Sequence, residues 1–333
     1  MKVQHILVPT DFSERSEVAI KMAGEFVDLF GCTVDLIHVI PLIKYFSESM
    51  DPLGLPFSLE ENLYPHCMEN SHKTLEELAQ KYIKKEYRGK MVTVIERKPS
   101  EAISKQANTG DYDLVLMSSK GEHNSIHVMG GTTEKVIRHC EVPVLAINDE
   151  MDIEQLNTIL VPIDFSETSF FSVIPAFELA KEFNAKIMLL NVVELYSAGS
   201  DMGPYIPTSI DENSVYNSLI TKLTEYLLEH EQYQLHVRKT GIPFQDVLVS
   251  TSGIQHITVD MNTKIIKGIS AQYEIADFAN DNADFVVMNT HGRTGLARIF
   301  IGSTTEQVSR QIKKPLLIVR PQFYEKEIDE NGN

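Results

Sequence analysis

The chain is 333 residues long, which exceeds one typical domain and favours two. Hydrophobic residues make up 43% of the chain, enough to bury a core, and a net charge of −17 argues against a nucleic-acid-binding surface. The sequence contains no stretch near the roughly 18 apolar residues that a membrane helix needs, and its 3 cysteines form no C-x-x-C pair. We therefore expect a cytoplasmic protein that binds neither nucleic acid nor membrane.

In the first 150 residues, strand and helix signals alternate along the chain. Short apolar runs predict strands at Ile6–Pro9, Val34–Ile40, Met91–Ile95, Leu114–Met117 and Val142–Ile147. Helices are predicted after an Asp-Phe-Ser turn, at Leu75–Lys85, at Glu101–Ala107, and from a Thr-Thr-Glu cluster onward. The serine of the turn can cap the helix that follows it.

The second half repeats this order. HILVPTDFSE, which begins at His5, returns as TILVPIDFSE at Thr158, and DLVLMSSKG returns as DFVVMNTHG. Strands are expected at Ile159–Pro162, Lys186–Val193, Lys264–Lys267, Phe285–Met288 and Pro315–Val319, with helices at Leu219–Leu228 and Ile275–Ala279. Since the matched blocks keep their order, we predict two copies of one domain, over residues 1–149 and 156–322.

Apolar strands that alternate with helices indicate a parallel sheet covered on both faces, whose ligands lie at the carboxyl ends of the strands. The second copy is the longer one: Pro162 to Gly292 spans 130 positions, whereas Pro9 to Gly121 spans 112. We place the extra residues within 234–262, where HITVD alternates as a strand does, and predict an inserted hairpin or edge segment.

A glycine loop follows the fourth strand of each copy. In the second copy, Gly292 is followed by nine residues and then by Gly302-Ser303, and Asn289 stands where the pattern Gly-x2-Gly-x9-Gly-(Ser/Thr) has its first glycine. Together with ILVPxDxS, this pattern resembles the universal stress protein family, over nearly the whole chain and twice. The resemblance implies an α/β fold of two repeated domains, each a five-stranded parallel sheet with helices on both faces, paired about a pseudo-twofold axis. It also implies ATP binding, which one branch of that family shows.

The second copy is the predicted nucleotide site. A glycine after a strand lets the backbone approach a ligand, and the first N–H groups of the following helix favour phosphate. The resemblance implies that Asp164 meets the ribose or an associated Mg²⁺ and that the backbone of Val192 faces adenine. The predicted nucleotide-binding residues are Pro162, Ile163, Asp164, Val192, Met288, Asn289, His291, Gly292, Arg293, Gly302, Ser303, Thr304 and Thr305.

A plainer interpretation stays open for each feature of the loop. The glycines could serve only as turns, Ser-Thr-Thr-Glu could only cap a helix, and Arg293 and Arg298 could lie on a solvated loop face. For Asn289, we expect that its tolerance of unusual backbone angles preserves the loop.

The first copy departs further from the pattern. Ser118 stands at the first glycine, only eight residues separate Gly121 from Gly130, Gly131 replaces the serine, and Glu122 stands where the second copy has Arg293. We therefore expect a degenerate nucleotide loop in domain 1, which binds nucleotide weakly or not at all.

These observations favour a stress-response protein that binds ATP or a related adenine nucleotide as a regulatory or signalling module. The sequence has no P-loop, no G-x-S-x-G elbow and no H-E-x-x-H motif, so we expect slow ATP hydrolysis at most. An alternative is a tandem scaffold that binds no nucleotide and acts through protein partners. An enzyme of the wider nucleotide-binding α/β group ranks third, because the Ser-Gly-Gly-x-Asp-Ser loop of that group is missing from this sequence. The resemblance also implies an internal dimer, and a homodimer of whole chains stays open.

Overall fold

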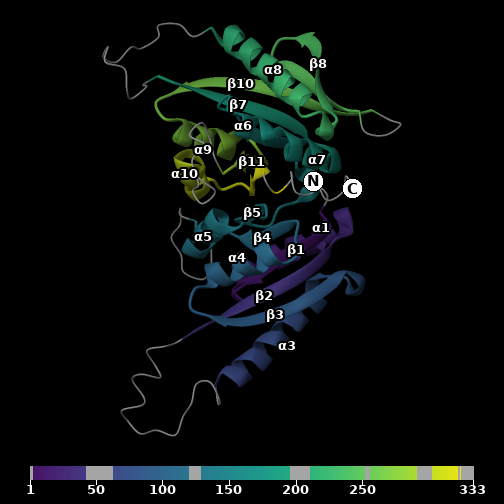
Figure 1. Ribbon diagram of the computed structural model, residues 1–333, viewed down its shortest axis with the longest axis vertical. Helices are drawn as coiled ribbons and strands as arrows, with labels where there is room; N and C mark the ends of the chain where they lie inside the picture. Colours follow the sequence, from purple (N-terminus) through teal and green to yellow (C-terminus); the bar gives the residue numbers. More distant parts are fainter. Residues whose placement is uncertain are drawn as a thin grey trace. The chain divides into compact units, whose positions relative to one another are not determined.

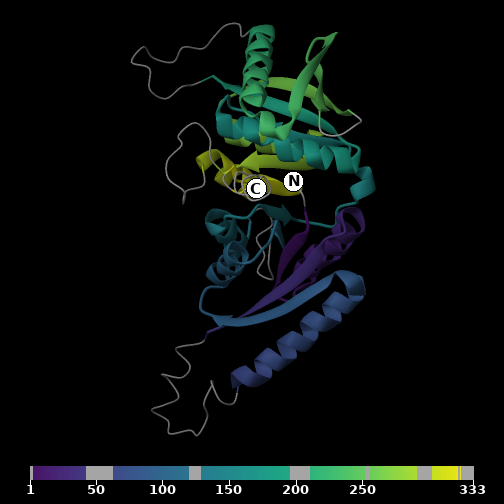
Figure 2. The same cartoon turned by 45° about the vertical axis from the view of Figure 1, so that its right-hand side comes forward.

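The computed structural model describes residues 3–42, 63–119, 129–195, 211–251, 256–290, 302–321 and 323. The chain divides into two compact units, Lys2–Met151 and Asp152–Asn333, which we call domain 1 and domain 2. Figures 1 and 2 show the helices and strands of each domain. None of the described helices combines the length and the apolar character needed to span a membrane.

Domain 1 is a five-stranded parallel sheet in the order β3–β2–β1–β4–β5 (Figure 1). The strands are β1 (His5–Thr10), β2 (Thr33–Pro41), β3 (Arg88–Glu96), β4 (Leu114–Ser118) and β5 (Val144–Ile147). The helices are α1 (Glu14–Phe30), α3 (Tyr64–Tyr82), the short η3 (Lys85–Tyr87), α4 (Pro99–Thr109) and α5 (Gly131–His139). This sheet confirms the predicted fold class for domain 1.

Two pairs of helices cover the domain 1 sheet. Helix α1 packs against α3 and contacts β1 and β4, whereas α4 packs against α5 and contacts β2. Figure 2 shows α3 lying along β3. The two pairs lie on opposite faces because right-handed crossovers change face where the strand order reverses, between β1 and β4. The apolar residues Ile6, Leu7 and Val8 of β1 are fully buried as a result.

Domain 2 repeats the parallel sheet and extends it. Its strand order is β12–β11–β6–β7–β10–β9–β8, in which the first five strands run parallel and β9 is antiparallel to both its neighbours. The strands are β6 (Thr158–Pro162), β7 (Lys186–Glu194), β8 (Leu235–Ile242), β9 (Gln245–Ser250), β10 (Ile257–Gly268), β11 (Phe285–Asn289) and β12 (Leu316–Val319). The helices are η4 (Ile153–Gln155), α6 (Glu167–Phe171), α7 (Val173–Phe183), α8 (Glu212–Glu229), η5 (Glu231–Tyr233), α9 (Ala271–Asn282) and α10 (Ser303–Gln311).

The hairpin β8–β9 is the main difference between the two sheets. It falls within residues 234–262, where the sequence places its extra material, and β10 rather than β8 pairs with β7, as β3 pairs with β2 in domain 1. The described residues of domain 1 contain no such hairpin. The hairpin therefore adds a surface that belongs to domain 2 alone.

The first helix also differs between the domains. In domain 1, α1 runs unbroken over 17 residues, whereas domain 2 divides the corresponding segment into α6 and α7 at Ser172. Pro175 lies in the first turn of α7, where it has no N–H to donate to the carbonyl of Phe171. The proline thus explains the break, which the sequence repeat alone does not indicate.

Candidate functional site

The topological switch point of domain 2 lies between β6 and β11. Strand β6 pairs with β7, the next strand along the chain, on one side and with β11 on the other. In parallel sheets of this kind, ligands bind outside the carboxyl ends of the strands at such a point. Pro162 ends β6, and Met288 and Asn289 end β11, so the structure brings these sequence-predicted residues to one edge.

Asp164 is built into the turn that joins β6 to α6. Its Oδ1 accepts hydrogen bonds from the backbone N–H of Ser166, at 3.0 Å, and from the Ser166 hydroxyl. The Ser166 side chain in turn caps α6 by accepting from the N–H of Ser169. Phe165 between them has a φ of 66°, a left-handed conformation that is uncommon outside glycine. The turn therefore fixes the half-buried carboxylate of Asp164 at the end of β6.

Strand β7 extends past the end of β6. The last β6–β7 pair is Pro162 with Leu190, after which the N–H of Ile163 donates to the Leu190 carbonyl at 2.8 Å. Because backbone hydrogen-bonding groups alternate sides along a strand, Val192 points its own N–H and C=O to the same side as Leu190. No strand pairs with Val192 on that side in the described residues, so its backbone edge opens at the switch point.

Side-chain hydrogen bonds tie α10 and α6 to the end of β11. The Asn289 amide donates to the backbone carbonyl of Thr168 in α6 at 2.9 Å, and the Thr305 hydroxyl of α10 donates to the Asn289 carbonyl at 2.8 Å. The N–H of Gly302 donates to the Thr290 carbonyl at 2.6 Å. Asn289 and Thr305 are both buried. These contacts hold the amino end of α10 beside the end of β11.

The structure corrects the expectation for Asn289 and limits what the Thr305 side chain can offer a ligand. Asn289 is an ordinary residue of β11 without a positive φ, so its side chain, not an unusual backbone angle, explains its role. The Thr305 hydroxyl is already engaged with β11 and does not serve as a free donor. Ser303 is exposed and keeps its hydroxyl at the surface.

The amino end of α10 carries no side-chain cap. Gly302 is its N-cap residue, with φ −60° and ψ 143°, and among the described residues no side chain accepts from the first N–H groups of the helix. The interpretation of Ser-Thr-Thr-Glu as a side-chain cap is therefore wrong. The N–H groups of Ser303 and Thr304 and the positive end of the helix dipole stand beside the switch point.

Domain 1 keeps the same framework at the carboxyl ends of β1 and β4. Phe12 has a φ of 65°, Ser13 caps α1, and the Thr133 hydroxyl donates to the Ser118 carbonyl at 2.9 Å. The N–H of Gly130 donates to the Ser119 carbonyl at 2.7 Å. Each of these contacts matches one in domain 2.

Other side chains at this edge of domain 1 differ from those at the matching positions of domain 2. His38 occupies the position of Asn191: its Nδ1 lies 2.8 Å from the Thr10 carbonyl oxygen, as the Asn191 amide lies 2.8 Å from that of Ile163. The His38 ring also stacks on Phe12, with centroids 4.0 Å apart. Burial lowers the pKa of His38, although the contact with Thr10 and the nearby Asp11 carboxylate act to raise it. The imidazole is therefore neutral at pH 7.

Three of the predicted binding residues, His291, Gly292 and Arg293, lie outside the described residues, and so does Arg298. The corresponding loop of domain 1, residues 120–128, also lies outside them. Within the described ranges, no group of three or more His, Cys, Asp or Glu side chains is arranged to hold a metal ion.

Comparison with known proteins agrees with this double architecture. The Universal stress protein family matches the chain twice, over residues 2–148 and 155–320. The chain belongs to the universal stress protein family. It carries two domains of that family in tandem, which confirms the resemblance seen in the sequence.

Relatives in the family match either the whole chain or one domain length. A universal stress protein of Mycolicibacterium smegmatis is 21% identical over 320 residues, covering 95% of this chain and 97% of that protein. Universal stress protein MJ0577 of Methanocaldococcus jannaschii is 32% identical over 151 residues, covering 43% of this chain and 93% of that protein. The crystal structure of a universal stress protein from Archaeoglobus fulgidus aligns with a TM-score of 0.60 at 19% identity, covering 96% of this chain and 99% of that chain, and supports the fold.

Proposed function

We propose that this tandem universal stress protein binds an adenine nucleotide, ATP foremost, at the carboxyl edge of the domain 2 sheet. The observation that supports this most is the uncapped amino end of α10, which Thr305 and Gly302 tie to the end of β11 beside the switch point. Such a helix end attracts phosphate through its free N–H groups and its dipole.

Each part of a nucleotide has a candidate partner at this edge. The phosphates would meet the N–H groups of Ser303 and Thr304, and Asp164 would meet the ribose or a Mg²⁺ ion carried by the phosphates. The backbone edge of Val192, which extends past β6, would receive the adenine ring. A metal would have to bring most of its ligands from the nucleotide and from water, because Asp164 is the one carboxylate we assign to it.

Fast turnover is not expected from the groups at this edge. The two carboxylates at the ends of β6 and β7 both hold turns: Asp164 accepts from Ser166, and Glu194 Oε1 accepts from the N–H of Ala271 at 2.8 Å. Neither is set as half of an acid/base pair. We therefore infer a regulatory or signalling role, in which bound nucleotide stabilises the conformation that a protein partner meets.

Calorimetric titration of the nucleotide-free full chain with ATP and Mg²⁺ tests this proposal. The variants Gly302→Val and Gly130→Val form a matched pair, because the two glycines have nearly the same backbone angles, −60° and 143° against −63° and 141°. These are extended angles that valine adopts readily. The backbone of either glycine can therefore accept valine, whose side chain would stand at the amino end of the helix.

We expect Gly302→Val to weaken ATP binding by on the order of tenfold or more and Gly130→Val to leave it unchanged. Loss of binding in Gly130→Val alone would overturn the assignment to domain 2. No detectable binding of ATP, ADP, AMP or cyclic AMP by the intact chain would favour the scaffold function instead. ATP turnover at rates on the order of 1–10³ per second would favour an enzyme.

A further inference from the structure

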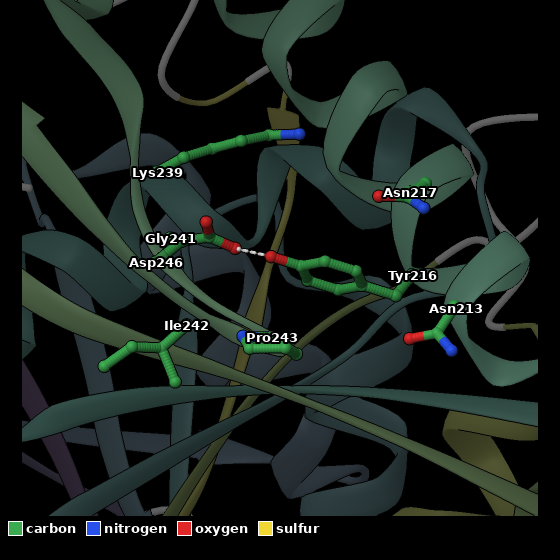
Figure 3. A pocket seen from close by; sticks show the side chains of 8 residues that line it. All are labelled: Asn213, Tyr216, Asn217, Lys239, Gly241, Ile242, Pro243 and Asp246. Atoms are coloured by element: carbon green, nitrogen blue, oxygen red, sulfur yellow. Dashed lines mark hydrogen bonds between the residues drawn. The ribbon is translucent and has the colours of Figure 1, made fainter.

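The hairpin β8–β9 and helix α8 line an open cavity of about 240 Å³ in domain 2 (Figure 3). Its lining residues include Asn213, Tyr216 and Asn217 of α8, Lys239 and Gly241 of β8, and Asp246 of β9. The volume is below the roughly 300–1,000 Å³ of pockets that hold drug-sized ligands. The cavity therefore suits a ligand smaller than a nucleotide.

Asp246 is a buried acid that is only half satisfied. It is 2% exposed, and its Oδ2 accepts a hydrogen bond from the Tyr216 hydroxyl at 2.7 Å. Its Oδ1 is buried and has no hydrogen-bond partner among the described residues. Figure 3 shows this second oxygen turned away from Tyr216, toward the side where Lys239 lies. A buried carboxylate oxygen without a donor is costly, and native proteins usually satisfy such groups.

The pKa shifts of Asp246 and Tyr216 agree with this geometry. Burial raises the pKa of Asp246, although the Tyr216 hydrogen bond and the Lys239 charge act to lower it. Burial and the contact with Asp246 raise the pKa of Tyr216 to about 12, so the phenol stays protonated and donates. The tyrosine thereby fixes one oxygen of the carboxylate and leaves Oδ1 on the side where Lys239 lies.

Lys239 carries the charge opposite to that of Asp246 but makes no direct contact with its carboxylate. It stands directly across from Asp246 in the β8–β9 register, where side chains of paired residues share a face. Even so, the described structure contains no ion pair between them, and both side chains line the cavity. In Figure 3 the lysine chain extends above the carboxylate rather than onto it. The cavity thus has a negative end and a positive end.

The backbone of the hairpin turns tightly beside this pair of residues. A register shift between Lys239 and Ile242 bends β8, and Gly241 within it has a φ of 86°, a conformation that favours glycine. At the turn, the ring of Phe244 lies 4.8 Å from that of Tyr216, and the Phe244 carbonyl accepts from the N–H of Thr263. The turn between Lys239 and Asp246 is therefore braced by contacts with α8 and β10.

We propose that this cavity binds a small zwitterion of free amino-acid size. Its ammonium group donates to the unpartnered Oδ1 of Asp246, and its carboxylate faces the Lys239 ammonium. The side-chain amides of Asn213 and Asn217 offer further donors and acceptors at the wall formed by α8. This site lies between the inserted hairpin and α8 and does not depend on the proposed nucleotide site.

A ligand-observed NMR screen of the twenty free α-amino acids against the full chain tests this proposal, followed by titration of the best binder. We expect at least one to bind, and Asp246→Asn to weaken it by on the order of tenfold or more, with a smaller loss in Lys239→Gln. Asp260→Asn and Arg238→Gln change exposed charges on the same sheet and should leave binding within about twofold.

Chemical variants of the ligand give a second arm that needs no mutant. The N-acetyl form of the best binder should lose most of its affinity, and the carboxamide form should lose part of it. No binding by any of the twenty, or equal binding of the free and N-acetyl forms, would overturn the proposal, and so would undiminished binding to a folded Asp246→Asn variant. If Asp246→Asn does not fold, the N-acetyl comparison decides.

Discussion

The carboxyl edges of the two sheets share a backbone framework and differ in the side chains placed on it. Both have a positive-φ phenylalanine after the first strand, at Phe12 and Phe165, and both tie the last helix to the fourth strand through Thr133 or Thr305. In domain 2, the fourth strand is also linked to α6 through Asn289. Since the framework persists in both domains, it does not by itself distinguish one edge from the other.

A few residue differences distinguish the carboxyl edge of the domain 1 sheet from that of the domain 2 sheet. Domain 1 has a stacked imidazole, His38, where domain 2 has the Asn191 amide, and Gly131 where domain 2 has Ser303. The aromatic stack of His38 on Phe12 occupies space beside β1 that the domain 2 edge fills with a smaller amide. This difference supports the view that nucleotide binding concentrates in domain 2.

The largest expected effect concerns the buried acid Asp35 of domain 1, which has no acidic counterpart at the matching position of domain 2. Asp35 is 1% exposed and accepts from the Tyr112 hydroxyl and from the N–H of Lys90, both at 2.8 Å, whereas the repeat has Met188 at this position. Asp35→Ala should lower the free energy of unfolding by about 3–5 kcal/mol, because it leaves buried donors without an acceptor.

Urea denaturation followed by circular dichroism measures that loss, and hydrogen exchange should place it in domain 1. Asp28→Ala, at an exposed ion pair with Lys84, is the control and should change stability by less than about 0.5 kcal/mol. A loss below about 1 kcal/mol for Asp35→Ala would show that water satisfies the same donors.

A smaller effect is expected at the link between Asn289 and α6 in domain 2. Asn289→Ser introduces the domain 1 residue and removes the amide that donates to Thr168. We expect a loss of about 1–2 kcal/mol in the free energy of unfolding of domain 2, since a buried hydrogen bond disappears. Asn282→Ser removes an exposed amide contact to Phe278 and should cost less than about 0.5 kcal/mol. Equal costs for the two variants would contradict a structural role for Asn289.

Removal of the serine helix cap should lower the free energy of unfolding by a similar amount in the two domains. Ser13→Ala and Ser166→Ala each remove a side chain that accepts from the third residue of the following helix, at 3.2 Å in both cases. Each should cost about 1 kcal/mol of stability, measured by urea denaturation. A difference greater than about 1 kcal/mol between them would mean that the shared framework is not energetically equivalent.

The smallest effect is a pH dependence that belongs to domain 1. Because the folded-state pKa of His38 is lowered from its usual 6.5, its contribution to stability is complete above about pH 6.5 and is lost as the pH falls below that value. His38→Asn, which installs the domain 2 residue, should therefore make the urea midpoint less sensitive between about pH 7.5 and pH 5.5. An unchanged pH profile in the variant would exclude this assignment.

Much of the fold follows from sequence because its signals are local. The apolar runs of β1 and β6 and the Asp-Phe-Ser turns predict the strands and the serine caps, which the structure has at Ser13 and Ser166. The early start of α3 at Tyr64 is harder to see, although Pro65 in its first turn is a helix-start signal.

The site depends on contacts that join distant residues, and these leave no local pattern. The Asn289–Thr168 bond spans 121 positions, and the Tyr216–Asp246 bond spans 30. The hairpin turn at Pro243 and Phe244 also lacks the Asn-Gly pair that marks many tight hairpins. A buried acid facing a cavity therefore becomes visible only once the fold brings α8 and β9 together.

Hydrogen exchange of the intact chain, with and without saturating ATP and Mg²⁺, tests the central claim most directly. We predict slower exchange in the turn at Asp164–Ser166 and in the first turn of α10 at Ser303–Thr305. The equivalent amides of domain 1, at Asp11–Ser13 and Gly131–Thr133, should exchange at unchanged rates. Equal protection in both domains, or protection in domain 1 alone, would contradict the assignment of the nucleotide site to domain 2.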